Sequence, residues 1–319
     1  MSASRKSPPF HRLAWQVLRL SRPHFLVGGL LLHTLGWAMA WYARGNVRLP
    51  SLLWGQAAIS SIQFMTHFSN DYFDYAADRA NRTPTRWSGG SRVLVAGELP
   101  PQVALYAALI CAGTALVATF VLALRLRTGA LTLPLLLLAL ALAWSYSAPP
   151  ARLHSRGLGE VTVALLVPGL TPLVGFYLQT GQLTWLPLLT AIPLCGLQFA
   201  MILTINFPDA SGDAAVGKRT LVLRLGEARA ARLLAGTLAL VYMSLPLLTA
   251  VGMPRLTAVL LALLMPASAV QAWRFWRGAW RHPSAWNSLG FWAILILVGS
   301  ITLACLAYLL PTIGVISPL

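Results

Sequence analysis

Acidic side chains are scarce in this chain. Only eight of its 319 residues are Asp or Glu, against 24 Lys and Arg, and charged residues of all kinds make up 10% of the sequence. A soluble globular domain carries roughly 25% charged residues. With a hydrophobic fraction of 57%, this composition excludes a soluble globular domain and favours an integral membrane protein.

Cysteine is also scarce. Cys111, Cys195 and Cys305 stand alone inside apolar runs, which excludes a disulfide framework and a zinc site built on paired cysteines. The net charge of +16 is spread over short loops rather than gathered on one soluble face. We therefore expect no nucleic-acid partner, and expect anionic lipid headgroups and an anionic substrate instead.

Long polar segments are missing as well, which leaves no room for a separate soluble domain. Apolar runs near the roughly 20 residues of a membrane-spanning helix fill most of the chain. They predict an all-α, polytopic domain over 25–319 with nine transmembrane helices, preceded by a basic cytoplasmic segment over 1–24. The nine ranges are 25–43, 51–69, 101–122, 129–147, 158–179, 184–204, 233–252, 256–272 and 288–310.

Basic residues set the expected orientation. If the N-terminus is cytoplasmic, the cytoplasmic segments carry 19 Lys and Arg and the opposite side carries five. This bias predicts the N-terminus inside and the C-terminus outside, in the inner (cytoplasmic) membrane. The alternative is that the first range is a cleavable signal, since it contains a small-residue pattern at Ala38 and Ala40. We take it as a retained span, because it completes an odd number of helices.

Five of the eight acids form two short clusters, each directly after an apolar run. The first runs from Asn70 to Asp78 and the second from Asn206 to Asp213. At about 100° per residue, each cluster presents its acids on one side of a helix. Carboxylates crowded at a membrane face repel one another unless cations are shared. If the acids of the two clusters face each other, they offer hard oxygen ligands for two or three Mg²⁺ ions. Magnesium typically takes substrate phosphates as further ligands.

Basic residues in the segments on the same predicted side as the acids would neutralise a diphosphate. The structural alternative for any one of them is a positive-inside anchor. The candidates for diphosphate contacts are Arg22, Arg82, Arg92, Arg152 and Lys218.

The two clusters resemble the aspartate motifs of the UbiA superfamily of intramembrane prenyltransferases. The first matches the pattern Asn-Asp-x-x-Asp-x-x-x-Asp, and Asp209 with Asp213 matches Asp-x-x-x-Asp. The stretch 146–150 resembles the loop after that family's fourth helix. Within the superfamily, the stretches 89–94 and 217–226 are most similar to the 1,4-dihydroxy-2-naphthoate branch.

This resemblance implies a bundle around a central cavity in which Mg²⁺ holds an isoprenyl diphosphate. An aromatic carbon would then attack C1 of the isoprenyl group, and in the naphthoate branch the acceptor would also lose CO₂. Asp71, Asp74, Asp209 and Tyr146 are implied as catalytic, with Tyr146 near the reacting carbon. The implied metal-binding residues are Asn70, Asp71, Asp74, Asp78, Asn206, Asp209 and Asp213.

Several alternatives stay open on the sequence. The acceptor could instead be 4-hydroxybenzoate, homogentisate or a chlorophyll-type molecule. An ion-coupled transporter would use the carboxylates as a cation site, but binding residues in transporters lie near the bilayer midplane. A non-catalytic quinone-binding protein would not need both motifs. Prenyl chain length, decarboxylation and oligomeric state are not determined by these residues.

Overall fold

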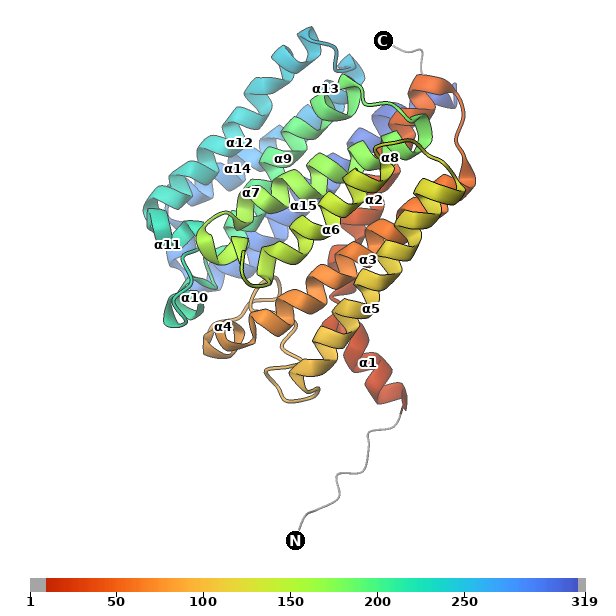
Figure 1. The fold of residues 1–319 in the computed structure, drawn as a ribbon. Coiled ribbons are helices and arrows are strands. Elements are labelled where there is room, and N and C mark those ends of the chain that lie inside the picture. The colour runs from red at the N-terminus through yellow and green to blue at the C-terminus, as the bar shows by residue number, and fades with distance from the viewer. Residues whose placement is uncertain (1–9, 315–319) are drawn as a thin grey trace.

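The computed structural model of this chain describes residues 10–314, and those residues contain helices and no strands. The long helical segments run side by side in one bundle (Figure 1). They are α2 (Pro23–Arg44), α3 (Leu49–Phe73), α5 (Pro101–Phe120) with η1 (Val121–Arg125), α6 (Thr132–Ser147), α7 (Gly159–Ala164) with η3 (Leu165–Leu170) and α8 (Thr171–Thr180), α9 (Trp185–Asn206), α12 (Glu227–Ala250), α13 (Arg255–Ala262) with α14 (Met265–Trp276), and α15 (Pro283–Thr312).

Shorter helices cap or connect these segments. They are α1 (Phe10–Leu20), α4 (Tyr75–Ala80), η2 (Leu153–Arg156), α10 (Ala210–Ala215), α11 (Leu221–Leu225) and η4 (Ala279–Arg281). Helix α1 falls inside the basic segment predicted over 1–24, of which residues 1–9 lie outside the described residues.

The ends of the long helices follow local chemistry. Pro23, Pro101 and Pro283 each stand at the first helical position, where a missing N–H costs nothing and φ is already helical. Gly45 and Gly181 cap the C-termini of α2 and α8 in the left-handed conformation, which glycine adopts without strain. The apolar runs are thus bounded by residues that start and stop helices.

Six helical segments within residues 10–314 are long and apolar enough to cross a membrane, and a seventh if α13 and α14, bent by 48°, count as one span. The prediction of a multi-pass membrane protein is therefore confirmed. Each of the nine predicted ranges overlaps a helical segment. The helices in two of these ranges are not among the candidate spans: α3 carries many polar residues, and α6 has only 16 residues. Nine crossings and the cytoplasmic N-terminus stay predictions.

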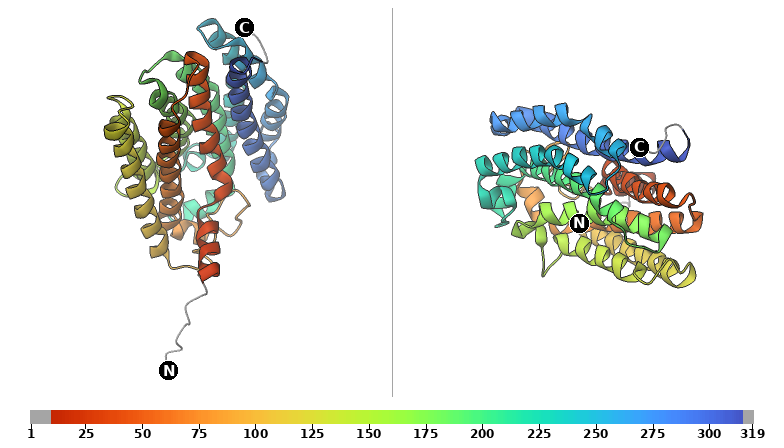
Figure 2. Two further views of the ribbon diagram at one scale, coloured as in Figure 1. Left: turned by 90° about the vertical axis from the view of Figure 1, so that its right-hand side faces the viewer. Right: turned by 90° about the horizontal axis from the view of Figure 1, so that it is seen from above.

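The short helices α1, α4, α10 and α11 gather at one end of the bundle, and α15 ends at the other (Figures 1 and 2). Both acidic clusters lie at the first of these ends. The loop 81–100 crosses this end and is fixed to α15, where Trp87 Nε1 donates to the carbonyl of Asn287 over 2.9 Å. Residues from the first third of the chain thereby meet the last helix.

Two separate hydrophobic cores stabilise the bundle. One joins α2, α9, α12, α14 and α15, with Leu35, Leu203 and Tyr308 fully buried. The other joins α3, α5, α6 and α8, with Met65 and Leu136 at its centre. Seen from above, the C-terminal helices and α5 lie on opposite sides of the molecule (Figure 2). Side chains of both cores line the cavity that contains the site.

Candidate active site

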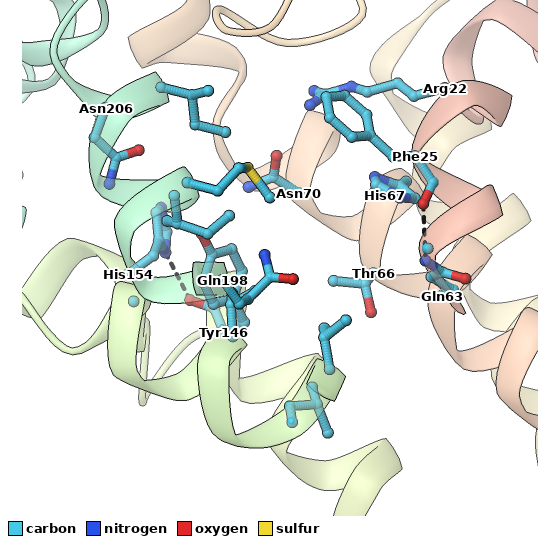
Figure 3. Close-up of a pocket in the computed structure, with 18 of the residues that line it drawn as sticks. Arg22, Phe25, Gln63, Thr66, His67, Asn70, Tyr146, His154, Gln198 and Asn206 are labelled. Carbon is cyan, nitrogen blue, oxygen red and sulfur yellow. Dashed lines mark hydrogen bonds between the residues drawn. The ribbon is translucent and has the colours of Figure 1, made fainter. Parts of the chain in front are cut away.

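A cavity of about 280 Å³ opens between the two cores. Its wall near α4 and α10 is polar and includes four of the five clustered aspartates. Farther along the bundle the wall becomes apolar, with Leu136 from α6, Val174 from α8 and Leu297 from α15. Figure 3 shows side chains from several helices converging on this space. An apolar chamber with one charged end suits a molecule with a charged head and a hydrocarbon tail.

Local chain breaks turn the two acidic clusters toward each other. Helix α3 ends at Phe73, Asp74 is its C-cap, and α4 begins at Tyr75. On the other side α9 ends at Asn206 and α10 begins at Ala210, after a turn that contains Asp209. Helices α4 and α10 pack closely at Gly212, where an added Cβ would lie 2.9 Å from Asn81 Cβ and 3.0 Å from the carbonyl oxygen of Ala77. A residue without a side chain therefore allows the clusters to meet.

Lys218 lies between the two clusters. Its Nζ is 3.0 Å from Asp74 Oδ1 in the first cluster and 3.0 Å from Asp213 Oδ1 in the second. Since each oxygen is 3.0 Å from the same nitrogen, the two oxygens are no more than 6 Å apart. The carboxylate rows thus share a cation within the protein. Burial would lower the pKa of Lys218, but the two carboxylates outweigh it and raise that pKa.

His154, on η2, is a second side chain in contact with Asp74. Its Nε2 lies 2.8 Å from Asp74 Oδ1, and its Nδ1 lies 2.6 Å from the carbonyl oxygen of Tyr146. The Ser155 hydroxyl lies 3.2 Å from the same Nε2, so both ring nitrogens have oxygen partners within hydrogen-bond distance. Burial would raise the pKa of Asp74, yet Lys218 and His154 together hold it well below its ordinary value.

Asp78 and Asp209 have no ion-pair partner among the described residues. Asp209 accepts hydrogen bonds from Asn81 Nδ2 over 2.7 Å and from the backbone N–H of Gly89 over 3.2 Å. Burial raises the pKa of Asp78 to about 8 and that of Asp209 to about 7, and neighbouring carboxylates add to both effects. A Cβ on Gly90, whose φ is +74°, would overlap Asp78, so only glycine fits at that position. Among the cavity aspartates, Asp78 and Asp209 are therefore the two whose negative charge is least compensated by cationic side chains of the protein.

The carboxylate oxygens that face the cavity fit a Mg²⁺ ion whose remaining ligands come from a substrate. Within residues 10–314 no three Asp, Glu, His or Cys side chains lie close enough to hold a metal by themselves. Two carboxylates from each cluster instead face one cavity. Magnesium typically takes one or two carboxylates and completes its shell with water and substrate phosphate. Asp78 and Asp209, which lack ion-pair partners at the charged end of the cavity, match this coordination by one or two carboxylates.

Asp71 does not line the cavity, although its spacing places it near Asp74 and Asp78. It is 3% exposed and forms an ion pair with the guanidinium of Arg22, which stands at the junction of α1 and α2. Its other oxygen accepts hydrogen bonds from the backbone N–H and the hydroxyl of Ser91. Arg22 lines the cavity, and its buried Nε has no hydrogen-bond partner within residues 10–314. Asp71 therefore contacts a cavity residue without facing the cavity.

The two asparagines present their amides in a defined direction. Asn206 Nδ2 donates to Glu160 Oε1 over 2.8 Å, and Asn70 Nδ2 donates to Asp74 Oδ2 over 2.8 Å. Because the nitrogens are engaged, the carbonyl oxygens are free to face the cavity, which both residues line (Figure 3). Glu160 is almost fully buried on α7. It fixes Asn206 beside the second cluster.

Comparisons with known proteins agree with this geometry. A family model described as the UbiA prenyltransferase family matches residues 31–295. The chain belongs to that family. This member of the UbiA family is accordingly a prenyltransferase, as the two aspartate motifs predicted.

Curated relatives of this UbiA-family chain are named for one reaction. The 1,4-dihydroxy-2-naphthoate octaprenyltransferase of Bacillus subtilis (strain 168) is 26% identical over 265 residues, covering 82% of this chain and 81% of that protein. The enzyme of the same name from Escherichia coli (strain K12) is 30% identical over 225 residues, covering 69% and 70%.

Solved structures share the fold of this UbiA-family chain. A UbiA homolog from Archaeoglobus fulgidus, bound to GPP and Mg²⁺, superposes with a TM-score of 0.60 at 16% identity, covering 91% of this chain and 99% of that one. A homolog from Aeropyrum pernix K1 gives a TM-score of 0.64 at 18% identity, covering 88% and 98%. At such identities the likeness supports the fold alone.

The predicted basic residues separate into two groups in this UbiA-family chain. Arg22 and Lys218 line the cavity. Arg82 and Arg152 are exposed and do not line it, and Arg92 donates to the backbone carbonyl of Asp78. The structure thus brings Arg22 and Lys218 to the cavity and leaves Arg82, Arg92 and Arg152 outside its lining. The reason at 152 is local, since the short helix η2 points His154 inward instead.

Sequence reasoning missed several residues of the site. His154 stands in a loop between exposed arginines, and no spacing rule connects it to Asp74, 80 residues earlier. Ser91 and Asn81 are not among the predicted site residues, although both bond to clustered aspartates. Glu160 carried one usable signal, because an acid beside an apolar run requires a partner. Tyr146 was predicted near the reacting groups and lines the cavity.

Proposed function

We propose that this chain transfers an isoprenyl group from its diphosphate to 1,4-dihydroxy-2-naphthoate, as in menaquinone biosynthesis. The observation that carries the proposal is Lys218, held between two carboxylate rows at the charged end of an apolar cavity. The names of the two relatives support the acceptor. The ligands of the A. fulgidus homolog, GPP or DMAPP together with Mg²⁺, support the donor class and the metal.

The metal-binding residues of this proposal are the four aspartates that line the cavity, assisted by the carbonyl oxygens of Asn70 and Asn206. When bound there, Mg²⁺ supplies positive charge that stabilises the departing diphosphate. The four aspartates are Asp74, Asp78, Asp209 and Asp213.

The protein's own cations take part in the same step. Lys218 and Arg22 both line the charged end, where their N–H donors stabilise charge as the bond between C1 and the diphosphate oxygen breaks. The apolar wall excludes water, which would otherwise capture the electron-poor C1. An aromatic carbon of the acceptor forms the new bond to C1, and the ring then releases CO₂ or a proton. Tyr146 faces this region and shapes it (Figure 3).

Asp71 has a different role in this proposal. Its oxygens are occupied by Arg22 and Ser91, so we assign it to orienting Arg22 rather than to binding metal. The charged end of the cavity is proposed to face the cytoplasm across the inner membrane, in line with the distribution of basic residues. A transporter is disfavoured because the four cavity aspartates lie at one end of the bundle rather than midway along it.

The test uses purified protein, Mg²⁺, isoprenyl diphosphates of increasing length and a panel of aromatic acceptors, with products identified by mass spectrometry. We expect a prenylated, decarboxylated product from 1,4-dihydroxy-2-naphthoate. We also expect Asp74→Asn and Asp209→Asn to lower turnover by at least about a hundredfold, because each removes charge from the site that stabilises the leaving group.

The matched control is Glu227→Gln, which neutralises an exposed acid at the start of α12 and should leave turnover within about twofold. If product forms only from 4-hydroxybenzoate or only from homogentisate, that compound is the acceptor instead. Absence of product with every aromatic compound, or full activity in Asp74→Asn, would contradict the proposal.

A further inference from the structure

Beyond the charged end, the cavity has a second polar surface. It consists of Thr66 and His67 on α3 and Gln198 on α9. His67 precedes Asn70 by three residues and Gln198 precedes Asn206 by eight, which places these groups roughly 4 to 12 Å deeper into the bundle at 1.5 Å per residue. We call these three residues the inner polar set. Most of the wall around them is apolar.

The inner polar set has hydrogen-bonding capacity that the protein does not use. Gln198 is 4% exposed, and its amide makes no hydrogen bond to any described residue. In Figure 3 this amide points into the cavity, between Tyr146 and Thr66. A buried amide inside a membrane protein is unfavourable unless something pairs with it.

The other two members face the same space. The Thr66 hydroxyl donates to the carbonyl of Ile62 over 2.8 Å, which leaves its oxygen able to accept. His67 makes no hydrogen bond within residues 10–314, and its ring stacks on Phe25 with centroids 6.0 Å apart. By contrast, Gln63 on the same helix donates to the carbonyl of Phe25 over 3.1 Å and is fixed to α2. Apart from Gln63 Oε1, which is also buried without a partner among the described residues, this free capacity belongs to the inner polar set.

The two parts of the donor substrate do not need these groups. An isoprenyl chain is a hydrocarbon and forms no hydrogen bonds, while a diphosphate is attracted to the cations and metal site at the charged end. The remaining substrate is an aromatic ring with oxygen substituents. An amide, a hydroxyl and an imidazole can each donate or accept, which matches a phenolic hydroxyl that does both.

We propose that Gln198, Thr66 and His67 form the acceptor subsite and bind the hydroxyl groups of a phenolic aromatic substrate. This inference rests on the proposed prenyl transfer. It gives the acceptor ring a position deeper than the diphosphate. It also explains why α3 is polar on its cavity side for two turns although it lies in a hydrophobic bundle.

The experiment measures steady-state kinetics for Gln198→Leu and Thr66→Val with the acceptor that the wild type uses. We expect the KM for the acceptor to rise about tenfold, as for the loss of one hydrogen bond to a substrate. The KM for the isoprenyl diphosphate should stay within about twofold. The matched control is Thr119→Val on α5, whose hydroxyl makes the same 2.8 Å bond to a carbonyl four residues earlier but lies outside the cavity.

An acceptor analogue with one hydroxyl replaced by a methoxy group gives an independent readout. We expect wild type to lose affinity for this analogue and Gln198→Leu to lose little more, because both changes remove the same hydrogen bond. Direct binding of the isoprenyl diphosphate shows whether each variant is folded, and Gln198→Met replaces Gln198→Leu if the latter does not bind.

The outcomes separate the two proposals. If wild type prenylates no aromatic compound, the proposed function fails. If wild type is active but the variants keep the wild-type KM for the acceptor, or lose affinity for the diphosphate alone, the acceptor subsite is overturned.

Discussion

Two ion pairs, one from α1 and one from its junction with α2, differ in burial and therefore in expected importance. Arg22 and Asp71 have side chains 14% and 3% exposed, whereas Arg19 and Glu98 are 39% and 28% exposed. Removing one partner of a buried pair leaves an uncompensated charge, while exposed pairs contribute little. The buried pair thus fixes Arg22 at the cavity, and the exposed pair only attaches α1 to the loop.

Asp71→Asn tests this difference at the level of one residue. We expect the KM for isoprenyl diphosphate to rise about tenfold, because Arg22 loses the carboxylate that orients it. The Mg²⁺ concentration for half-maximal activity should change less than twofold. Kinetics at varied diphosphate and Mg²⁺ concentrations measure both values.

Glu98→Gln is the control for that variant, since it breaks the exposed pair with Arg19. It should leave both constants within about twofold. A large shift in Mg²⁺ dependence for Asp71→Asn, similar to that of Asp74→Asn, would return Asp71 to the metal site predicted from the sequence.

Among the helices, the contact between α4 and α10 decides whether the clusters meet. We expect Gly212→Ala to lower turnover at least about tenfold and to lower the thermal midpoint of unfolding. Its new Cβ would meet Asn81 Cβ at 2.9 Å and the Ala77 carbonyl at 3.0 Å, pushing the two helices apart. Activity assays and thermal unfolding in detergent check both effects.

Gly113→Ala is the matched substitution, because Gly113 is also helical and nothing lies within 4 Å of its added Cβ. Alanine favours a helix over glycine, so this variant should be neutral or slightly more stable. Equal behaviour of the two variants would show that the approach of α4 and α10 does not limit activity.

Sequence patterns predicted the helices better than their contacts. Apolar runs and helix-ending residues locate the long segments, since each run must be shielded from water regardless of its neighbours. Helical spacing also groups Asp71 with Asp74, but it cannot reveal that Arg22, 49 residues earlier, lies beside Asp71. The same holds for His154 and for the unpaired amide of Gln198. Their roles arise from tertiary packing, which single-chain periodicity does not encode.

For the molecule as a whole, orientation in the membrane is the main untested prediction. In a variant with the three cysteines replaced, we expect Thr83→Cys to react with a membrane-impermeant maleimide only after right-side-out vesicles are opened. Gln182→Cys should react in intact vesicles. Both positions are exposed, and the distribution of Lys and Arg places them on opposite sides. The reverse labelling pattern would place the charged end of the cavity outside.

The two hydrophobic cores also have a thermodynamic consequence. Because most helices pack in only one core, with α8 contributing Phe176 to one and Val174 to the other, we expect either half to loosen partly without the other, as in other proteins with sub-global opening. A molecule that fills the cavity contacts both halves, since Leu136 lies in one core and Leu297 in the other. Occupancy therefore makes the halves unfold together, so hydrogen exchange should slow across both at once when the cavity is filled.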